Sequence, residues 1–211
     1  MKVAIFGAGT MGSGIAQVSA AAGYKVYLWD LTTEIAQNSK NKIAAGLDRQ
    51  IARGKMTEEA KETLLNNLIP CDDFAVAADV DLIMEAVPEN IEIKKSTYAK
   101  LEQYCRPDAI IGTNTSYIPI STLAADLQHP ERFLGMHFFN PADRMKLVEV
   151  IAGVNTPQET VDTIIKISEE INKTPVQVNE LVSKLTDGKM ADVTINCVNV
   201  PDQEMTAVLC T

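Results

Sequence analysis

The chain has 211 residues, 46% of them hydrophobic, which is enough for one main domain with a sizeable core. Its 28 acidic residues outnumber its 19 basic ones, and the formal net charge of -9 argues against binding to nucleic acid or to an anionic membrane surface. No run approaches the roughly 18 apolar residues of a membrane span, and the N-terminus lacks the long apolar core of a signal peptide. Four widely spaced cysteines without a C-x-x-C pair suggest neither a metal cage nor a disulfide framework, so we expect a cytoplasmic protein.

The first 30 residues have the pattern of a βαβ unit. Residues 3–6 are a short apolar run typical of a buried strand, and residues 13–22 are alanine-rich and end at Gly23, as a helix commonly does. Residues 25–30 form a second apolar run that ends in Asp30. Strand, glycine loop, helix and strand in this order predict two parallel strands with a right-handed crossover.

The same alternation continues along the chain. Two long stretches and one interrupted stretch are predicted to be helical: residues 91–105, residues 157–172, and residues 32–67 with a bend near Gly54. Five short apolar runs are predicted to be strands: residues 80–86, 109–113, 133–138, 147–151 and 175–178. The sum predicts an α/β fold with a doubly wound, mostly parallel sheet of the Rossmann type.

Residues 7–12 read GAGTMG and lie between the first strand and the first helix. A G-x-G-x-x-G loop in this context, with an acid about 20 residues later, is the fingerprint of a dinucleotide site. Gly7 permits the tight turn, Gly9 lets the backbone approach the pyrophosphate, and Gly12 lets helix and strand pack closely. The helix N-terminus supplies amides and partial positive charge to the phosphates. The predicted cofactor-binding residues here are Gly7, Gly9, Thr10, Met11, Gly12 and Asp30.

Asp30 indicates which dinucleotide to expect. Its carboxylate would accept hydrogen bonds from a ribose diol and repel a 2′-phosphate, and residues 31–33 supply no arginine to hold one. The hypothesis is therefore NAD(H) in preference to NADP(H). The alternative is that the glycines only shape a turn and Asp30 only ends a strand.

His137, one of two histidines, lies in the aromatic stretch GMHFFNP at residues 135–141. On physical grounds alone, a single histidine among phenylalanines is more often a packed core residue than a proton carrier. A histidine that transfers protons needs a partner, usually a carboxylate, to fix its tautomer. Glu149 lies among apolar residues in the next predicted strand, where a carboxylate is costly to bury unless it is paired.

Five motifs carry a resemblance to a known family. GAGTMGSGIA begins at Gly7, EAVPEN at Glu85, GTNTS at Gly112, GMHFFNP at Gly135 and MKLVEVI at Met145. In this order and spacing, the chain resembles the 3-hydroxyacyl-CoA dehydrogenase family, most closely its bacterial 3-hydroxybutyryl-CoA members, from residue 1 to about residue 178. The resemblance implies hydride transfer between C3 of a 3-hydroxyacyl-CoA and the nicotinamide of NAD.

The resemblance also implies roles for individual residues. His137 would be the general acid/base, and Glu149 the carboxylate that orients it. Ser116 would hydrogen-bond the substrate oxygen, and Asn140 would position nicotinamide and substrate. A bland reading of Ser116 is a serine that caps the turn after a strand.

Four further positions are carried over less specifically. Glu89 and Lys94 resemble positions that border the cofactor ribose and the nicotinamide end, and Asn114 is a further candidate for cofactor binding that could instead form a turn. Lys55 lies near the position where the family holds the phosphates of coenzyme A, although a solvated lysine at a helix bend is about as good an interpretation. No metal site is expected.

The family pattern stops near residue 178. There the resemblance implies a Pro-Gly-Phe turn and a helical domain of about 100 residues, which closes the substrate cleft and forms the family dimer. The chain has no such turn. Residues from about 180 to 211 resemble instead an internal segment of medium-chain dehydrogenases that act on diamino acids. We therefore predict a chimera, with an NAD-binding domain at residues 1–178 and a foreign segment at residues 179–211.

In that segment the pattern predicts a short helix at residues 181–185, a strand at residues 193–198 and a closing helix at residues 204–209. Together they would add one βα unit to the edge of the sheet. Two alternatives stay open: the segment covers exposed apolar surface without joining the sheet, or it only marks a truncated product.

The leading functional hypothesis is an NAD-dependent 3-hydroxyacyl-CoA dehydrogenase of fatty acid and butyrate metabolism, acting on acetoacetyl-CoA or 3-hydroxybutyryl-CoA. Its turnover would be impaired, because the missing helical domain removes positioning contacts. The alternative is a dinucleotide-binding chimera or truncated domain that catalyses nothing. A related enzyme for β-hydroxyacids without coenzyme A is disfavoured by the HFFNP and LVEVI motifs. Without the family's dimerising helices, a monomer and a new association both stay open.

Overall fold

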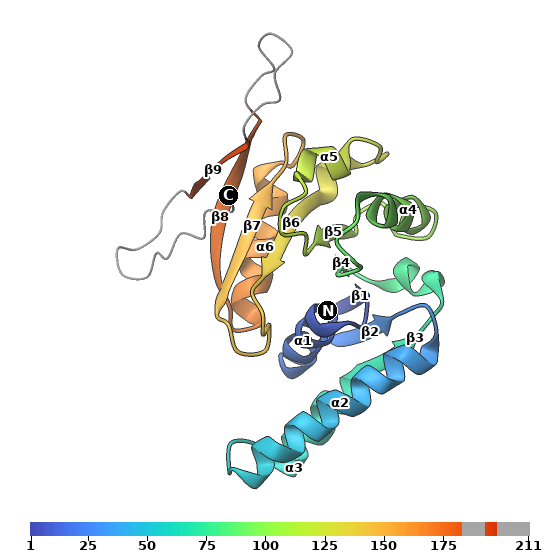
Figure 1. Ribbon diagram of the computed structural model, residues 1–211, viewed down its shortest axis with the longest axis vertical. Helices are drawn as coiled ribbons and strands as arrows, with labels where there is room; N and C mark the ends of the chain where they lie inside the picture. The colour runs from blue at the N-terminus through green and yellow to red at the C-terminus, as the bar shows by residue number, and fades with distance from the viewer. Residues whose placement is uncertain (183–192, 198–211) are drawn as a thin grey trace.

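A computed structural model describes residues 1–182 and 193–197, with side chains up to residue 178. Within these ranges, nine strands form one sheet in the order β3-β2-β1-β4-β5-β6-β7-β8-β9 (Figure 1). The strands are β1 (Lys2–Phe6), β2 (Lys25–Trp29), β3 (Leu68–Cys71), β4 (Leu82–Glu85), β5 (Ile110–Thr113), β6 (Phe133–Phe138), β7 (Leu147–Ala152), β8 (Thr174–Val182) and β9 (Val193–Cys197).

Helices cover the sheet and extend from it. The α-helices are α1 (Thr10–Ala21), α2 (Thr33–Ala52), α3 (Glu58–Asn67), α4 (Ile91–Leu101), α5 (Ile120–Ala124) and α6 (Gln158–Glu170). The described residues also form two 3-10 helices, η1 (Phe74–Asp79) and η2 (Pro130–Arg132). Helices α2 and α3 lie side by side and project beyond the sheet, as Figure 1 shows. None of the described helices is long and apolar enough to cross a membrane.

Strands β3, β2, β1, β4, β5 and β6 are parallel, so the predicted doubly wound, mostly parallel Rossmann-type sheet is confirmed. Strand β7 runs antiparallel to β6, and β8 is parallel to β7. The chain order reverses between β1 and β4, and in such sheets ligands bind in the crevice at the carboxyl ends of the strands beside that point. The loop at residues 7–9 and the loop at residues 86–90 follow these two strands.

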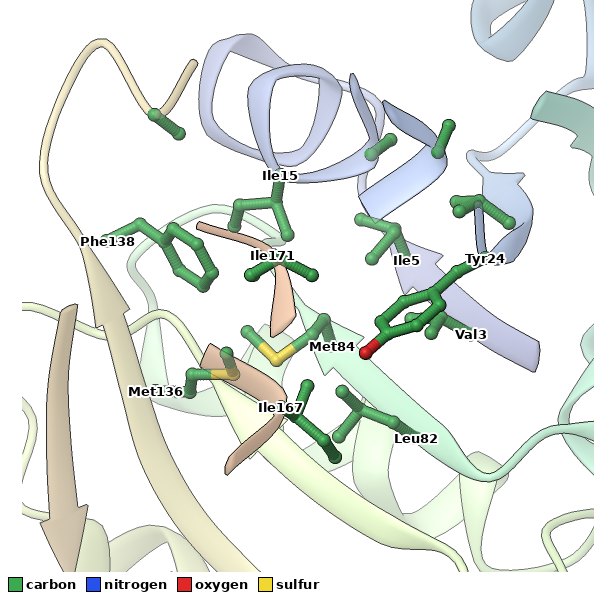
Figure 2. Packing of buried hydrophobic residues seen from close by; sticks show 14 of the residues in the cluster. Val3, Ile5, Ile15, Tyr24, Leu82, Met84, Met136, Phe138, Ile167 and Ile171 are labelled. Carbon is green, nitrogen blue, oxygen red and sulfur yellow. The ribbon is translucent and has the colours of Figure 1, made fainter. Parts of the chain in front are cut away.

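The core consists of two apolar clusters on opposite faces of the sheet. Alternate residues of β1 supply them, because successive side chains of a strand point to opposite faces: Val3 and Ile5 join one cluster, Ala4 and Phe6 the other. The first cluster packs against α1 and α6, and Figure 2 shows Ile15 of α1 and Ile167 of α6 among its members. The second lies against α4 and α5.

Five elements differ from the sequence prediction, and two of them are the 3-10 helices η1 and η2, which were not predicted. Strand β3 was not predicted, since Pro70 removes a ladder hydrogen bond; it is tolerated because β3 is an edge strand. The five-residue helix α5 was also not predicted. Leu181 and Val182, where the pattern predicted the start of a helix, lie at the end of strand β8 instead.

Strand β9 joins the sheet beside β8 where residues 193–198 were predicted to form a strand. It pairs antiparallel to β8, with Val178 opposite Cys197 and Val182 opposite Val193. The predicted helix at residues 204–209 lies outside the described residues. Strand β8 runs across the predicted boundary at residue 178, and the division into two segments stays a prediction.

Candidate active site

The glycine loop between β1 and α1 has the geometry of a phosphate cradle. Gly7 has φ +106°, and a Cβ there would come within 2.5 Å of the Ala86 carbonyl oxygen. A Cβ on Gly12 would meet the Gly7 oxygen at 1.7 Å, whereas a Cβ on Gly9 would meet nothing within 4 Å. Gly7 and Gly12 are thus required by packing inside the protein, and Gly9 faces open space.

That open space lies at the N-terminus of α1. Gly9 is the N-cap residue and makes no side-chain capping bond, and the first amides of a helix have no partner within the helix. Thr10 is exposed and Met11 partly exposed at this end. These features fit the pyrophosphate of a dinucleotide, which a helix N-terminus binds through its amides and its dipole.

Asp30 follows β2 and reaches back to the same loop. Its Oδ2 accepts a hydrogen bond from the Ala8 amide at 2.8 Å, and its Oδ1 accepts one from the Leu31 amide at 2.7 Å. A carboxylate can accept about four hydrogen bonds, so it retains acceptor capacity for a ribose diol. Asp30 therefore connects the end of β2 to the glycine loop.

His137 is paired with Glu149 across two strands. The register of β6 and β7 places the two residues opposite each other, and His137 Nδ1 lies 2.8 Å from Glu149 Oε2. An ionised carboxylate only accepts hydrogen bonds, so this contact assigns the hydrogen to Nδ1 and leaves Nε2 free to exchange a proton. The side chains are 16% and 28% exposed, respectively, so both are sheltered and reachable.

Ser116 lies on the other side of the imidazole. Its Oγ is 3.3 Å from His137 Nε2, and the residue is exposed just beyond the end of β5. Asn114 links the same loop to β6, since its side-chain oxygen accepts a hydrogen bond from the Phe138 amide at 2.8 Å. The structure therefore brings together Ser116, His137 and Glu149, and gives Asn114 a supporting contact between two strand ends.

Glu89 and Lys94 form part of a buried network under the Ser116 loop. One oxygen of Glu89 accepts hydrogen bonds from Thr115 Oγ1 at 2.5 Å and from the Ser116 amide at 2.8 Å. The other lies 3.1 Å from Lys94 Nζ. Burial would raise the pKa of Glu89, but these hydrogen bonds and the ammonium lower it below its ordinary value. Lys94 is only 1% exposed, so its ammonium contacts carboxylates inside the protein.

A groove of about 290 Å³ runs along α1 and α2 to the loop after β6. Asn140 lines it next to a cis peptide bond to Pro141, and Thr10 borders it at the helix N-terminus. Four cationic side chains are also among its lining residues: Lys42, Arg49, Arg53 and Arg144. Lys55 is exposed just beyond α2 and is not among these lining residues. The cations that line the groove are therefore not the lysine that the sequence analysis named.

The sequence analysis did not identify Glu85, the arginines of the groove or Thr115. A signal for Glu85 existed, because an acid at the end of a buried apolar run is costly without a partner. The arginines had no comparable signal, since their position along the same groove as Asn140 depends on tertiary packing. Among the described residues, no group of three or more potential ligands could hold a metal ion.

The chain matches the family described as "3-hydroxyacyl-CoA dehydrogenase, NAD binding domain" over residues 2–181. The chain belongs to the 3-hydroxyacyl-CoA dehydrogenase family. It therefore carries the NAD-binding domain of an oxidoreductase family, and NAD is its cofactor.

Three relatives define the likeness further. The chain is 43% identical over 175 residues to a 3-hydroxyadipyl-CoA dehydrogenase of Escherichia coli K12, covering 83% of this chain and 37% of that protein. A crystal structure of 3-hydroxybutyryl-CoA dehydrogenase from Escherichia coli K12 is 42% identical with a TM-score of 0.83, covering 85% of this chain and 38% of that one. The (S)-3-hydroxybutyryl-CoA dehydrogenase of Ralstonia eutropha is 35% identical with a TM-score of 0.83, covering 86% and 64%. The chain thus spans less than two thirds of each relative's length.

Proposed function

We propose that this chain catalyses NAD-dependent oxidation and reduction at C3 of a short 3-hydroxyacyl-CoA, such as 3-hydroxybutyryl-CoA. The observation that carries the proposal is the imidazole of His137 held between Glu149 Oε2 at 2.8 Å and Ser116 Oγ at 3.3 Å. This arrangement lies at the carboxyl ends of the strands, the same edge as the glycine loop that fits a pyrophosphate.

The proposed chemistry assigns one task to each group. NAD, when bound, accepts or supplies the hydride. His137 Nε2 removes the proton from the 3-hydroxyl during oxidation and returns it during reduction, while Glu149 holds the Nδ1 hydrogen and stabilises the imidazolium that forms. Ser116 donates a hydrogen bond to the substrate oxygen, and Asn140, which lines the groove, positions the nicotinamide and the acyl group. Asn114 and Glu89 border the cofactor, with Lys94 behind Glu89.

The groove supports coenzyme A as the carrier of the acyl group. Arg49, Arg53 and Arg144 place cationic charge along it in a protein whose net charge is -9. Phosphate groups bind such guanidinium groups with charge-assisted hydrogen bonds. Lys55, nearby but outside the lining, would add only a weak long-range attraction.

The test is NADH oxidation with acetoacetyl-CoA by the purified chain, beside a His137→Ala variant. We expect turnover that falls at least about 100-fold in the variant, the loss typical of a missing general acid. NADH should bind both proteins equally and at least about tenfold more tightly than NADPH, because Asp30 repels the 2′-phosphate. Turnover that survives in His137→Ala would exclude the proposed role of His137, and preferential NADPH binding would exclude that of Asp30.

A second candidate is a chain that binds NAD and catalyses nothing. The observation behind it is that the family model matched by residues 2–181 is described as an NAD binding domain. NADH binding without turnover in both proteins would support it. The interpretation of residues from about 180 onward as a segment of another dehydrogenase also stays a prediction.

A further inference from the structure

A fully buried acid ends strand β4. The Glu85 side chain is 0% exposed, and its two oxygens accept hydrogen bonds from one backbone amide and three side chains. The donors are Val87 N at 2.7 Å, Lys94 Nζ at 2.8 and 3.1 Å, Tyr98 Oη at 2.5 Å and Thr113 Oγ1 at 2.7 Å. All of these groups donate, so the arrangement fits the ionised carboxylate, which only accepts.

Lys94 connects this carboxylate to a second one. Its Nζ lies 2.8 Å from Glu85 Oε1 and 3.1 Å from Glu89 Oε2. An ammonium that is only 1% exposed depends on such partners, because burial of an unpaired charge is very costly. The position of Lys94 is therefore set by Glu85 on one side and by Glu89 on the other.

Glu89 in turn holds the turn that carries Ser116. Its Oε1 accepts hydrogen bonds from Thr115 Oγ1, from the Ser116 amide at 2.8 Å and from the Tyr117 amide at 3.3 Å. This turn places Ser116 Oγ 3.3 Å from His137 Nε2. The contacts run without a gap from Glu85 through Lys94 and Glu89 to the turn beside the imidazole.

We propose that Glu85 is a positioning residue, which through Lys94 and Glu89 fixes the turn that places Ser116 against His137. Its importance for catalysis rests on the proposed function, but its effect on the geometry does not. Glu85 has no exposed surface, so it acts through its neighbours and not by touching cofactor or substrate.

The experiment measures the imidazole nitrogen signals of the whole chain by 15N NMR. The chain has two histidines, and the exposed His129, whose Nδ1 lies 3.1 Å from Glu131, is an internal reference. In Glu85→Gln, the amide cannot accept all of the donated hydrogen bonds, so Lys94 and then the turn should shift. We expect the Nε2 signal of His137 to move toward that of an imidazole without a serine contact, while the signals of His129 stay in place.

Lys94→Met separates positioning from a through-space charge effect. It removes a positive charge where Glu85→Gln removes a negative one, so a purely electrostatic influence would move the His137 signals in opposite directions. Positioning predicts a shift in the same direction in both variants. Opposite shifts, or unchanged His137 signals in a folded Glu85→Gln protein, would overturn the proposal.

Two further variants complete the design. Tyr98→Phe removes the neutral donor to Glu85 Oε2, the oxygen that lies farther from Lys94 Nζ. It should lower the melting temperature without moving the His137 signals, and a shift equal to that of Glu85→Gln would count against the proposal. If the buried variants do not fold, Glu89→Gln decides the matter, because its side chain is 27% exposed. Unchanged His137 signals in that variant would refute the proposal. None of these readouts requires turnover, so the outcome is independent of whether the chain is an active enzyme.

Discussion

The three glycines of the loop at residues 7–12 serve different physical purposes. Gly7 needs the left-handed backbone and Gly12 the close approach to the Gly7 oxygen, and both requirements exist without any ligand. Gly9 alone borders open space at the N-terminus of α1. Its lack of a side chain matters for a group that approaches from outside.

Gly9→Ala and Gly12→Ala are therefore expected to separate binding from stability. Gly12→Ala should lower the free energy of unfolding by about 3 kcal/mol, because its Cβ collides with backbone. Gly9→Ala should cost less than about 1 kcal/mol, yet weaken NADH binding by about tenfold or more, since the methyl group occupies the approach to the helix amides. Urea unfolding and NADH fluorescence titration measure the two effects. Equal losses of stability in both variants would contradict this division.

His137 shows how partners decide the role of a residue. A histidine among phenylalanines is compatible with a packed core position, and Phe139 does lie against its ring, with 4.8 Å between ring centroids. The pairing with Glu149 and the approach of Ser116 make it a polar site instead. The expectation for Glu149 came from the cost of burying an unpaired carboxylate, and the same reasoning applied to Glu85 would have identified the buried network.

At the scale of elements, the turn between α6 and β8 is hydrogen-bonded to the loop that follows β6. Lys173 Nζ donates to the Met145 carbonyl at 2.8 Å and also to the Ala142 carbonyl. Burial lowers the pKa of Lys173. From the loop, Lys146 Nζ donates to the Asn172 carbonyl at 3.0 Å, but this lysine is exposed. Both lysines donate to backbone carbonyls, but the bonds of Lys173 are buried or partly buried and the bond of Lys146 is exposed.

That difference predicts unequal effects. Lys173→Met should lower the free energy of unfolding by about 1–2 kcal/mol, because it leaves the buried Ala142 carbonyl and the partly buried Met145 carbonyl without their donor. Lys146→Met, the matched control, should change it by less than about 0.5 kcal/mol, since water replaces the lost donor. Urea unfolding of both variants is the measurement. A control as unstable as Lys173→Met would show that burial is not the deciding factor.

Tyr24 lies between α1 and β2, and its hydroxyl donates a hydrogen bond to Glu170 of α6. Burial, and then this carboxylate, raise the pKa of the Tyr24 phenol above its ordinary value of 10.0. The folded state thus retains a proton that the unfolded chain loses above that pH. The resulting stabilisation is complete below pH 10.0 and declines as pH rises toward the higher folded pKa.

The wild-type chain should therefore lose more stability than Tyr24→Phe when pH is raised from about one unit below to one unit above the ordinary phenol value. Urea unfolding at the two pH values gives the comparison. Parallel losses in both proteins would mean that Tyr24 titrates alike in the folded and unfolded states.

At the scale of the whole molecule, the candidate site is assembled from one edge of the sheet. The glycine loop follows β1, Glu89 follows β4, Ser116 follows β5 and His137 lies near the end of β6. These four strands are neighbours in space and parallel, so their carboxyl ends meet. A site spread over more than 130 positions of sequence is thereby brought into one crevice.

Strand β9 is the last strand in the sheet order, and its pairing can be tested. Because β9 pairs antiparallel with β8, alternate amides of residues 193–197 should be protected from hydrogen exchange. NMR-detected exchange of the whole chain measures this. Uniformly fast exchange at these amides would mean that the strand does not join the sheet in solution.

Local patterns predicted the elements that depend on local rules. Gly54 and the N-cap residue Thr57 indicated the bend between α2 and α3. The Thr57 side chain accepts a hydrogen bond from the Ala60 amide at 3.1 Å. Strand β3 was not predicted, because a strand tolerates Pro70 only at the edge of a sheet. The local sequence does not indicate which strand lies at an edge. Leu181 and Val182 suit either a helix or a strand, and pairing with Thr194 and Val193 of β9 places the end of β8 in the sheet.

The sequence by itself determined the parallel sheet, the glycine loop with Asp30, and the candidate pair His137 and Glu149, because periodicity, turn chemistry and the cost of buried charge act over short range or through residue type. Only the tertiary structure decided the antiparallel register that places His137 opposite Glu149, the cations of the groove, and the network from Glu85 to Ser116. These depend on which distant residues share a buried volume, and there each charge is stable only beside its particular partner.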